Sequence, residues 1–120
     1  MPKKIMICDD DLGILEMMEM IVEEFGFQAF TQANSVNILK DIERERPDLL
    51  LLDIWMPVLS GDQVMKTIKA DSRLASLPVI MYSASAEGSA IALSAGADDY
   101  IAKPFDIELL ETKIQTLLKN

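Results

Sequence analysis

The sequence has no histidine, a single cysteine and few aromatic residues. The lack of histidine removes the commonest zinc ligand and the usual proton shuttle. Cys8 cannot form a disulfide within the chain, which agrees with a reducing compartment. The apolar run at residues 5–8 is too short for a signal peptide or a membrane span. We therefore expect a cytoplasmic location and no insertion into a membrane.

Basic residues are also scarce, with 11 against 20 acidic residues and a formal net charge of -9. Such a charge repels nucleic acid and anionic membranes and attracts cations, so we expect no direct binding of nucleic acid. The chain has 120 residues, half of them hydrophobic, which is the size and balance of one globular domain. We expect residues 1–120 to form that domain.

Five short apolar runs rich in β-branched or leucine residues predict strands at 5–8, 27–31, 49–52, 79–82 and 100–102. The longer segments between and after them have helical spacing. The first helix is the clearest, with an apolar side formed by Ile14, Met18, Ile21, Val22 and Phe25. We expect its methionines, Met17 and Met20 included, to pack in the core.

The remaining helices are predicted from sparser apolar spacing: Val36, Leu39 and Ile42; Val64 and Ile68; Ile91 and Ala95; Ile107, Leu110, Ile114 and Leu117. Local signals mark some of their ends. Ser60 and Gln63 have the spacing of a capping box, Gly96 is suited to end a helix, and Asp106 is suited to begin one.

The alternation of strands and helices predicts the fold class. The connections are long enough for helical crossovers, so the sheet should be parallel and covered by helices on both faces. Four consecutive leucines at residues 49–52 agree with a strand that is buried on both sides. The expected architecture is a three-layer α/β/α unit with a five-stranded parallel sheet.

Reactive side chains follow four of the predicted strands at their carboxyl ends: Asp9, Asp10, Asp53, Ser83 and Lys103. Ligands of such sheets bind beyond these ends, so the five side chains should meet at one edge. Three crowded carboxylates repel one another unless a cation joins them. Mg²⁺ is the expected cofactor, with Mn²⁺ as a substitute, because the chain has no dedicated calcium-binding loop.

Asp53 is the candidate nucleophile because it ends the predicted central strand. Its carboxylate can attack phosphorus and form an acyl phosphate, provided that the phosphoryl oxygens meet positive charge and hydrogen-bond donors. Lys103 and Ser83 supply a cation and a hydroxyl for this purpose, while Asp9 and Asp10 hold the metal. Asp11 is interpreted as a helix cap or a solvated acid, and Cys8 as a core thiol.

These residues resemble the receiver domain of two-component response regulators over essentially the whole chain. The resemblance rests on five fragments in order: Asp9-Asp10, Asp53 with Met56-Pro57 and Gly61, Ser83-Ala84, Ala95-Gly96-Ala97, and Lys103-Pro104-Phe105. It implies the strand order 2-1-3-4-5 and phosphorylation of Asp53 by a histidine kinase or a histidine phosphotransfer protein. It also implies that Mg²⁺ binds Asp10, Asp53 and the backbone carbonyl of Trp55, with Asp9 assisting.

The resemblance further implies a switch that acts on a downstream protein. Phosphorylation would draw the Ser83 hydroxyl toward the phosphate, and Tyr100 would turn inward. A Lys103–Pro104 peptide bond in the cis form is chemically allowed and common in the family. Ser83 replaces the more frequent threonine. The bulk of Trp55 leads us to hypothesise a long-lived acyl phosphate.

Several alternatives remain open from the sequence. The chain could be a phosphorelay intermediate that passes its phosphoryl group to a histidine phosphotransfer protein, a free-standing regulator, or a receiver excised from a longer regulator. A degenerate receiver would lack one of the aspartates of the site or its lysine, and this sequence has lost neither. A related hydrolase would need an acid at position 55, where Trp55 stands, and a nucleotide-binding protein would need a glycine-rich loop where Asp9 stands. We expect no enzyme beyond slow self-catalysed phosphorylation and dephosphorylation.

Overall fold

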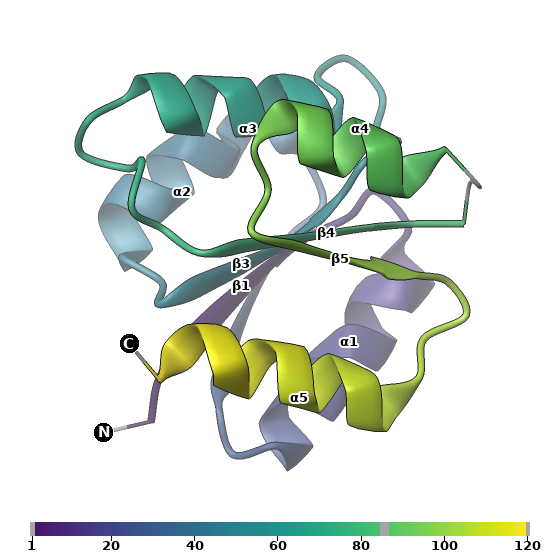
Figure 1. Cartoon of the computed structure of the whole chain (residues 1–120). Coiled ribbons are helices and arrows are strands. Elements are labelled where there is room, and N and C mark those ends of the chain that lie inside the picture. Colours follow the sequence, from purple (N-terminus) through teal and green to yellow (C-terminus); the bar gives the residue numbers. More distant parts are fainter. Residues whose placement is uncertain (1, 85–86, 120) are drawn as a thin grey trace.

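A computed structural model of the chain describes residues 2–84 and 87–119 (Figure 1). Within them five strands form one parallel sheet in the order β2-β1-β3-β4-β5. The strands are β1 (Lys4–Cys8), β2 (Gln28–Gln32), β3 (Leu49–Asp53), β4 (Val79–Ser83) and β5 (Asp99–Ala102). The predicted fold class and strand order are therefore confirmed, and the predicted bounds differ by at most one residue at each strand end.

Helices connect the strands and cover both faces of the sheet. They are α1 (Leu12–Glu24), α2 (Ile38–Glu45), α3 (Gly61–Ala70), α4 (Gly88–Ala95) and α5 (Ile107–Leu118), with a short 3-10 turn, η1 (Ser35–Asn37), before α2. Figure 1 shows α1 and α5 on one face and α2, α3 and α4 on the other. In the described part of the chain, no helix has the length and apolar character needed to cross a membrane.

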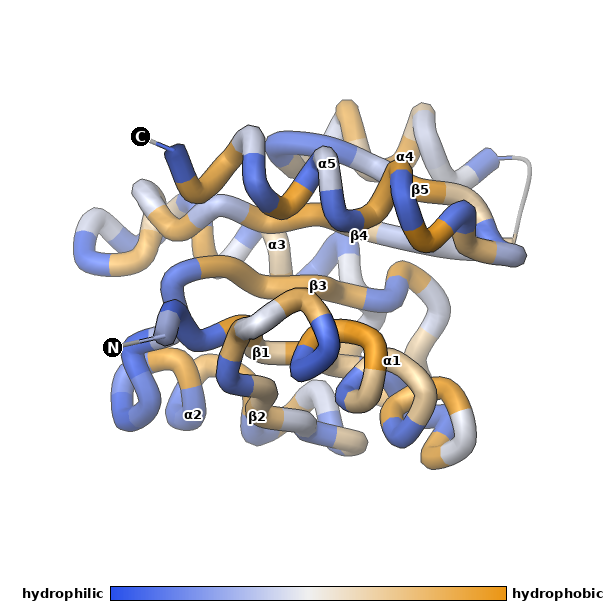
Figure 2. Tube along the Cα trace, turned by 90° about the horizontal axis from the view of Figure 1, so that it is seen from below, coloured by the Kyte–Doolittle hydropathy of each residue, from blue (hydrophilic) through white to orange (hydrophobic). Residues whose placement is uncertain are grey.

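The hydrophobic core consists of two clusters, one on each face of the sheet. Alternate residues of β3 divide between them, so that Leu49 and Leu51 pack under α1 and α5 while Leu50 and Leu52 pack under α2, α3 and α4. Figure 2 shows the resulting hydrophobic colour along β1 and β3 between helices of mixed character. Burial on both sides explains why these strands lack the alternation of polar and apolar residues that a half-exposed strand has.

The local signals at the helix ends are confirmed. Asp11 caps α1 by accepting hydrogen bonds from the backbone N–H groups of Gly13 and Ile14. Asp106 caps α5 in the same way. The Ser60 N–H donates to Gln63 Oε1 at 2.9 Å, as expected for a capping box. Gly96 ends α4 at φ 92°, a left-handed conformation that glycine adopts without strain.

Some predicted core positions are wrong. Met17 and Met20 are exposed on α1, whereas Met18 is fully buried and Leu15 fills the place of a further core residue. The reason is the helical period: positions 15, 18 and 22 share the face toward the sheet, and positions 17 and 20 lie away from it. Two further residues that were predicted to lie on the apolar sides of helices are also exposed: Val36 in η1 and Ile107 at the start of α5.

The strand register brings the polar ends of the strands together. Cys8 pairs with Leu52, Asp53 with Tyr82, and Ser83 with Ala102. The residues that follow β1 and β5 therefore lie level with the last residues of β3 and β4. Parallel pairing alone places these ends on one edge of the sheet.

Candidate functional site

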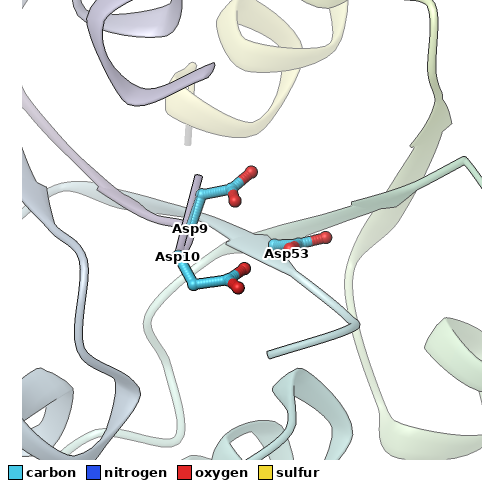
Figure 3. Close-up of side chains that lie close together, drawn as sticks. All are labelled: Asp9, Asp10 and Asp53. Carbon is cyan, nitrogen blue, oxygen red and sulfur yellow. The ribbon is translucent and has the colours of Figure 1, made fainter. Parts of the chain in front are cut away.

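Three carboxylates gather at this edge (Figure 3). Asp9 and Asp10 follow β1, and Asp53 is the last residue of β3. One carboxylate oxygen from each lies within 4.8 Å of the others. Asp9 and Asp53 are buried and Asp10 is exposed, so the group opens to solvent on the side of Asp10. Oxygen donors of this kind and spacing fit a hard divalent cation such as Mg²⁺.

Hydrogen bonds hold the Asp9 carboxylate on both oxygens. Asp9 Oδ1 accepts from the backbone N–H of Asp11 at 2.9 Å. Asp9 Oδ2 accepts from the phenolic hydroxyl of Tyr82 at 2.8 Å. Because Asp9 is 1% exposed, these two donors replace hydration that burial has removed.

Lys103 places a positive charge between two of the acids. Its Nζ lies 3.5 Å from Asp9 Oδ2 and 3.9 Å from Asp53 Oδ1. The peptide bond that joins Lys103 to Pro104 is cis. At these distances the ammonium makes no tight pair with either carboxylate, so it can reach an additional anionic group placed at Asp53.

The electrostatic environment of Asp53 favours the neutral acid. Burial, followed by the negative charge of Asp9, raises the pKa of Asp53 from 3.8 to about 7. Asp10 adds to this effect, while Lys103 and the backbone N–H of Trp55 oppose it. A cation at the site would favour the ionised carboxylate, which is the nucleophilic form.

The backbone around Asp53 is held by a close contact with the start of α3. The Gly61 N–H donates to the carbonyl of Ile54 at 2.7 Å. A Cβ atom at position 61 would lie 2.2 Å from the backbone oxygen of Asp53. Gly61 is therefore required by this approach, which fixes where β3 ends and α3 begins.

Ser83 and Tyr100 meet at the ends of β4 and β5. Ser83 is fully buried, and its carbonyl accepts hydrogen bonds from the Lys103 N–H at 2.9 Å and from the Tyr100 hydroxyl at 3.1 Å. Tyr100 is half-buried and packs against the cluster under α2, α3 and α4. The ring already lies inward in this structure, whereas the sequence led us to expect that it turns inward on phosphorylation.

Tyr82 is the residue of the site that the sequence analysis missed. It was predicted only as part of a buried strand. Its hydroxyl contacts Asp9, and its ring lies 5.1 Å from Lys103 Nζ. A signal was present in the sequence, because a tyrosine in a fully buried strand needs a partner for its hydroxyl, and position 82 directly precedes the reactive end of the strand.

Comparison with known proteins decides the family. Residues 5–115 match the family model described as the response regulator receiver domain. The chain belongs to this family. As a receiver it is a signalling domain of two-component systems and not an enzyme of the classical kind.

The receiver resembles solved structures over its whole length. A putative response regulator from Chloroflexus aurantiacus is 27% identical and covers 100% of both chains, with a TM-score of 0.95. The chemotaxis protein CheY4 of Vibrio cholerae is 26% identical and covers 98% of this chain and 100% of its own, with a TM-score of 0.88.

A curated relative of the receiver is the alkaline phosphatase synthesis transcriptional regulatory protein PhoP of Bacillus subtilis. The two sequences are 31% identical, and the match covers 100% of this chain but 50% of PhoP. The chain thus spans about half the length of the curated relatives that it matches.

The remaining site candidate of the receiver is Trp55, two residues after Asp53. Its side chain is 51% exposed, and its backbone N–H lowers the pKa of Asp53. Val58, further along the same loop, has φ 70° and is exposed. The β3–α3 loop that follows Asp53 therefore carries two exposed apolar side chains.

Proposed function

We propose that this receiver domain, residues 1–120, accepts a phosphoryl group on Asp53 and acts as a signalling switch. The first and last residue of these bounds lie outside the described part of the chain. The observation that carries the proposal is the position of Lys103, whose Nζ lies 3.9 Å from Asp53 at an edge where three carboxylates meet. This combination supplies a nucleophile and the positive charge that a phosphoryl group needs.

The donor is a phosphohistidine on a histidine kinase or a histidine phosphotransfer protein. A carboxylate oxygen of Asp53 forms a bond to phosphorus as the bond from phosphorus to the imidazole nitrogen breaks. The electron pair of the broken bond leaves with the imidazole. Lys103 binds a phosphoryl oxygen, and the Ser83 hydroxyl donates a hydrogen bond to another. A small phosphoryl donor can replace the protein donor in a slow self-catalysed reaction.

The metal ion of the proposed reaction is Mg²⁺, for which Mn²⁺ substitutes. Asp10, Asp53 and the backbone carbonyl of Trp55 would hold it, with Asp9 assisting. When bound, the ion neutralises negative charge on the carboxylates and on the phosphoryl oxygens. Such a cation would counter the burial and the neighbouring charge of Asp9 that raise the pKa of Asp53.

The response is a change in the surface near Tyr100, which contacts a downstream protein. The support for this step is the shared hydrogen-bond acceptor, since the Ser83 carbonyl binds both Lys103 and Tyr100. A movement of Ser83 toward a phosphate on Asp53 would alter both hydrogen bonds. Two packings of Tyr100 would then have different populations in the phosphorylated and free receiver.

The test is the mass of the intact protein after incubation with acetyl phosphate and Mg²⁺. Wild type should gain about 80 Da, the mass of one phosphoryl group. Asp53→Asn should gain nothing. Asp11→Asn is the matched control, because it removes the same charge two residues from Asp9 and keeps a side chain that caps α1. Absence of the adduct from wild type, or its presence in Asp53→Asn, would overturn the proposal.

Two arrangements of the whole protein are compatible with this function. Relatives such as PhoP extend to about twice this length and are named transcriptional regulators, whereas CheY4 is matched over its full solved chain. The receiver can accordingly be part of a longer regulator or act alone, including as a phosphorelay intermediate. Direct binding of nucleic acid by these residues is not proposed, because their net charge is -9. A cytoplasmic location stays a prediction.

A further inference from the structure

Tyr82 joins three parts of the site. Its hydroxyl donates to Asp9 Oδ2 at 2.8 Å, and its ring lies 5.1 Å from Lys103 Nζ. The ring also meets Phe105 edge to face, with centroids 5.2 Å apart. Tyr82 itself is fully buried, whereas Lys103 and Phe105 are partly exposed. Lys103 and Phe105 are two residues apart in the same loop, and both contact the ring of Tyr82.

We propose that Tyr82 is a positioning residue that sets the affinity of the site for Mg²⁺ by keeping Asp9 from a closer ion pair with Lys103. The inference rests on the proposed function, because it assigns a role toward the cation of that function. Tyr82 itself does not contact the reacting atoms. It acts through the orientation of the Asp9 carboxylate.

Tyr82 and Lys103 compete for one oxygen of Asp9. Asp9 Oδ2 accepts from Tyr82 at 2.8 Å and lies 3.5 Å from Lys103 Nζ. Without the phenolic donor, the buried carboxylate keeps the hydrogen bond from the Asp11 N–H, and Lys103 is the cation beside it. The Asp9–Lys103 ion pair, 3.5 Å long in this structure, then shortens and replaces the lost bond. That pair neutralises a carboxylate of the acidic group, and Mg²⁺ binds more weakly.

The alternative is a purely structural role, in which Tyr82 is a core aromatic residue whose hydroxyl bonds to the nearest acceptor. In that case its loss would lower the stability of the fold and leave Mg²⁺ binding as it was. The two roles are separable, because a hydroxyl deletion that acts through Asp9 can have no effect once the Asp9 carboxylate is gone.

The experiment measures Mg²⁺ affinity by the fluorescence of Trp55 in four proteins: wild type, Tyr82→Phe, Asp9→Ala, and the double variant. Loss of an outer hydrogen-bond partner typically weakens metal binding by 10- to 100-fold, and we expect about tenfold for Tyr82→Phe. In the Asp9→Ala background, Tyr82→Phe should change the affinity less than twofold. The extent of phosphorylation at saturating Mg²⁺ should change less than the affinity does.

Each outcome has one meaning. Wild-type affinity in Tyr82→Phe, or an equal loss in both backgrounds, would overturn the role of Tyr82 and leave the proposed function intact. A wild type that shows no response to Mg²⁺ would instead count against the proposed function.

Tyr82→Phe keeps the ring, and its folding is checked first by urea denaturation without Mg²⁺. If the variant does not fold, NMR of the wild type provides a second readout. The label is ¹³C at Cζ, the ring carbon of tyrosine that is bonded to oxygen. The Tyr82 signal should shift during the Mg²⁺ titration with the same midpoint as Trp55 fluorescence. An unmoved Tyr82 signal would overturn the inference.

Discussion

Gly88 lies directly against the hydroxyl of Tyr100. A Cβ atom at position 88 would be 2.3 Å from that oxygen and 2.8 Å from the ring. Gly88 is the first residue of α4, and Tyr100 is in β5. The missing side chain therefore makes room for Tyr100 to lie inward and reach the Ser83 carbonyl.

This contact predicts strong coupling between the two positions. Gly88→Ala should destabilise the fold by about 1–3 kcal/mol through overpacking, unless Tyr100 moves outward. In a Tyr100→Ala background the same substitution should be neutral or slightly stabilising, because the clash with the ring is gone and alanine has a better helix propensity than glycine. Urea denaturation of the four proteins gives the coupling energy. Additive effects within about 0.5 kcal/mol would contradict the predicted contact.

The raised pKa of Asp53 predicts a dependence of stability on pH. The folded value of about 7 lies above the ordinary 3.8, so the folded chain binds the proton more tightly. The stabilisation is complete below about pH 4 and is lost as the pH rises through about 7. Asp53→Asn cannot ionise at this position and should not show this loss.

The measurement is urea denaturation of wild type and Asp53→Asn at pH 5 and pH 8 with EDTA. The advantage of the variant should grow by about 1 kcal/mol between these pH values. Of the pKa difference of roughly 3 between the folded and unfolded chain, about 2 takes effect between pH 5 and pH 8, which corresponds to about 2.6 kcal/mol, and this is roughly halved because the site opens to solvent. Saturating Mg²⁺ should stabilise wild type at pH 8. A difference that is the same at both pH values would show that Asp53 ionises normally in the fold.

Lys103→Met is predicted to separate metal binding from phosphorylation. Removal of the ammonium 3.9 Å from Asp53 takes a positive charge from the acidic group, so Mg²⁺ should bind several-fold more tightly at pH 8. Phosphorylation by acetyl phosphate should slow by about 10²–10³-fold, the cost typical of removing one such electrostatic contact. Trp55 fluorescence and intact mass measure the two effects. Equal losses in both would mean that Lys103 only maintains the fold.

Trp55→Asn is predicted to shorten the lifetime of the phosphorylated receiver. The Trp55 side chain is bulky and half-exposed, and it stands two residues from Asp53 in the sequence. A smaller polar residue should admit and orient a hydrolytic water, and the loss of the adduct should be several-fold faster. The decay is followed by intact mass after removal of the donor. Val58→Asn, on the same loop, serves as a comparison, and an unchanged rate in Trp55→Asn would refute the role of Trp55.

The sequence predicted the features that depend on hydrophobic periodicity and on hydrogen bonds between residues close in the chain. The four leucines of β3 gave a strand buried on both faces, and the caps at Asp11, Asp106 and Gly96 were recognised because each acts within a few residues. The exposed methionines were not predicted. Hydrophobicity alone cannot tell which side of α1 faces the sheet when apolar residues occupy more than one side.

The sequence by itself determined the fold class and the strand ends at which Asp9, Asp10, Asp53, Ser83 and Lys103 stand, because alternation and polarity are properties of the chain. Tertiary structure alone decided the contacts made by Tyr82 and Gly88. Tyr82 is 73 residues from Asp9, and the hydrogen bond between them arises only when β1 and β4 flank β3. Distances of this kind depend on strand register and helix packing, which no local pattern of residues specifies.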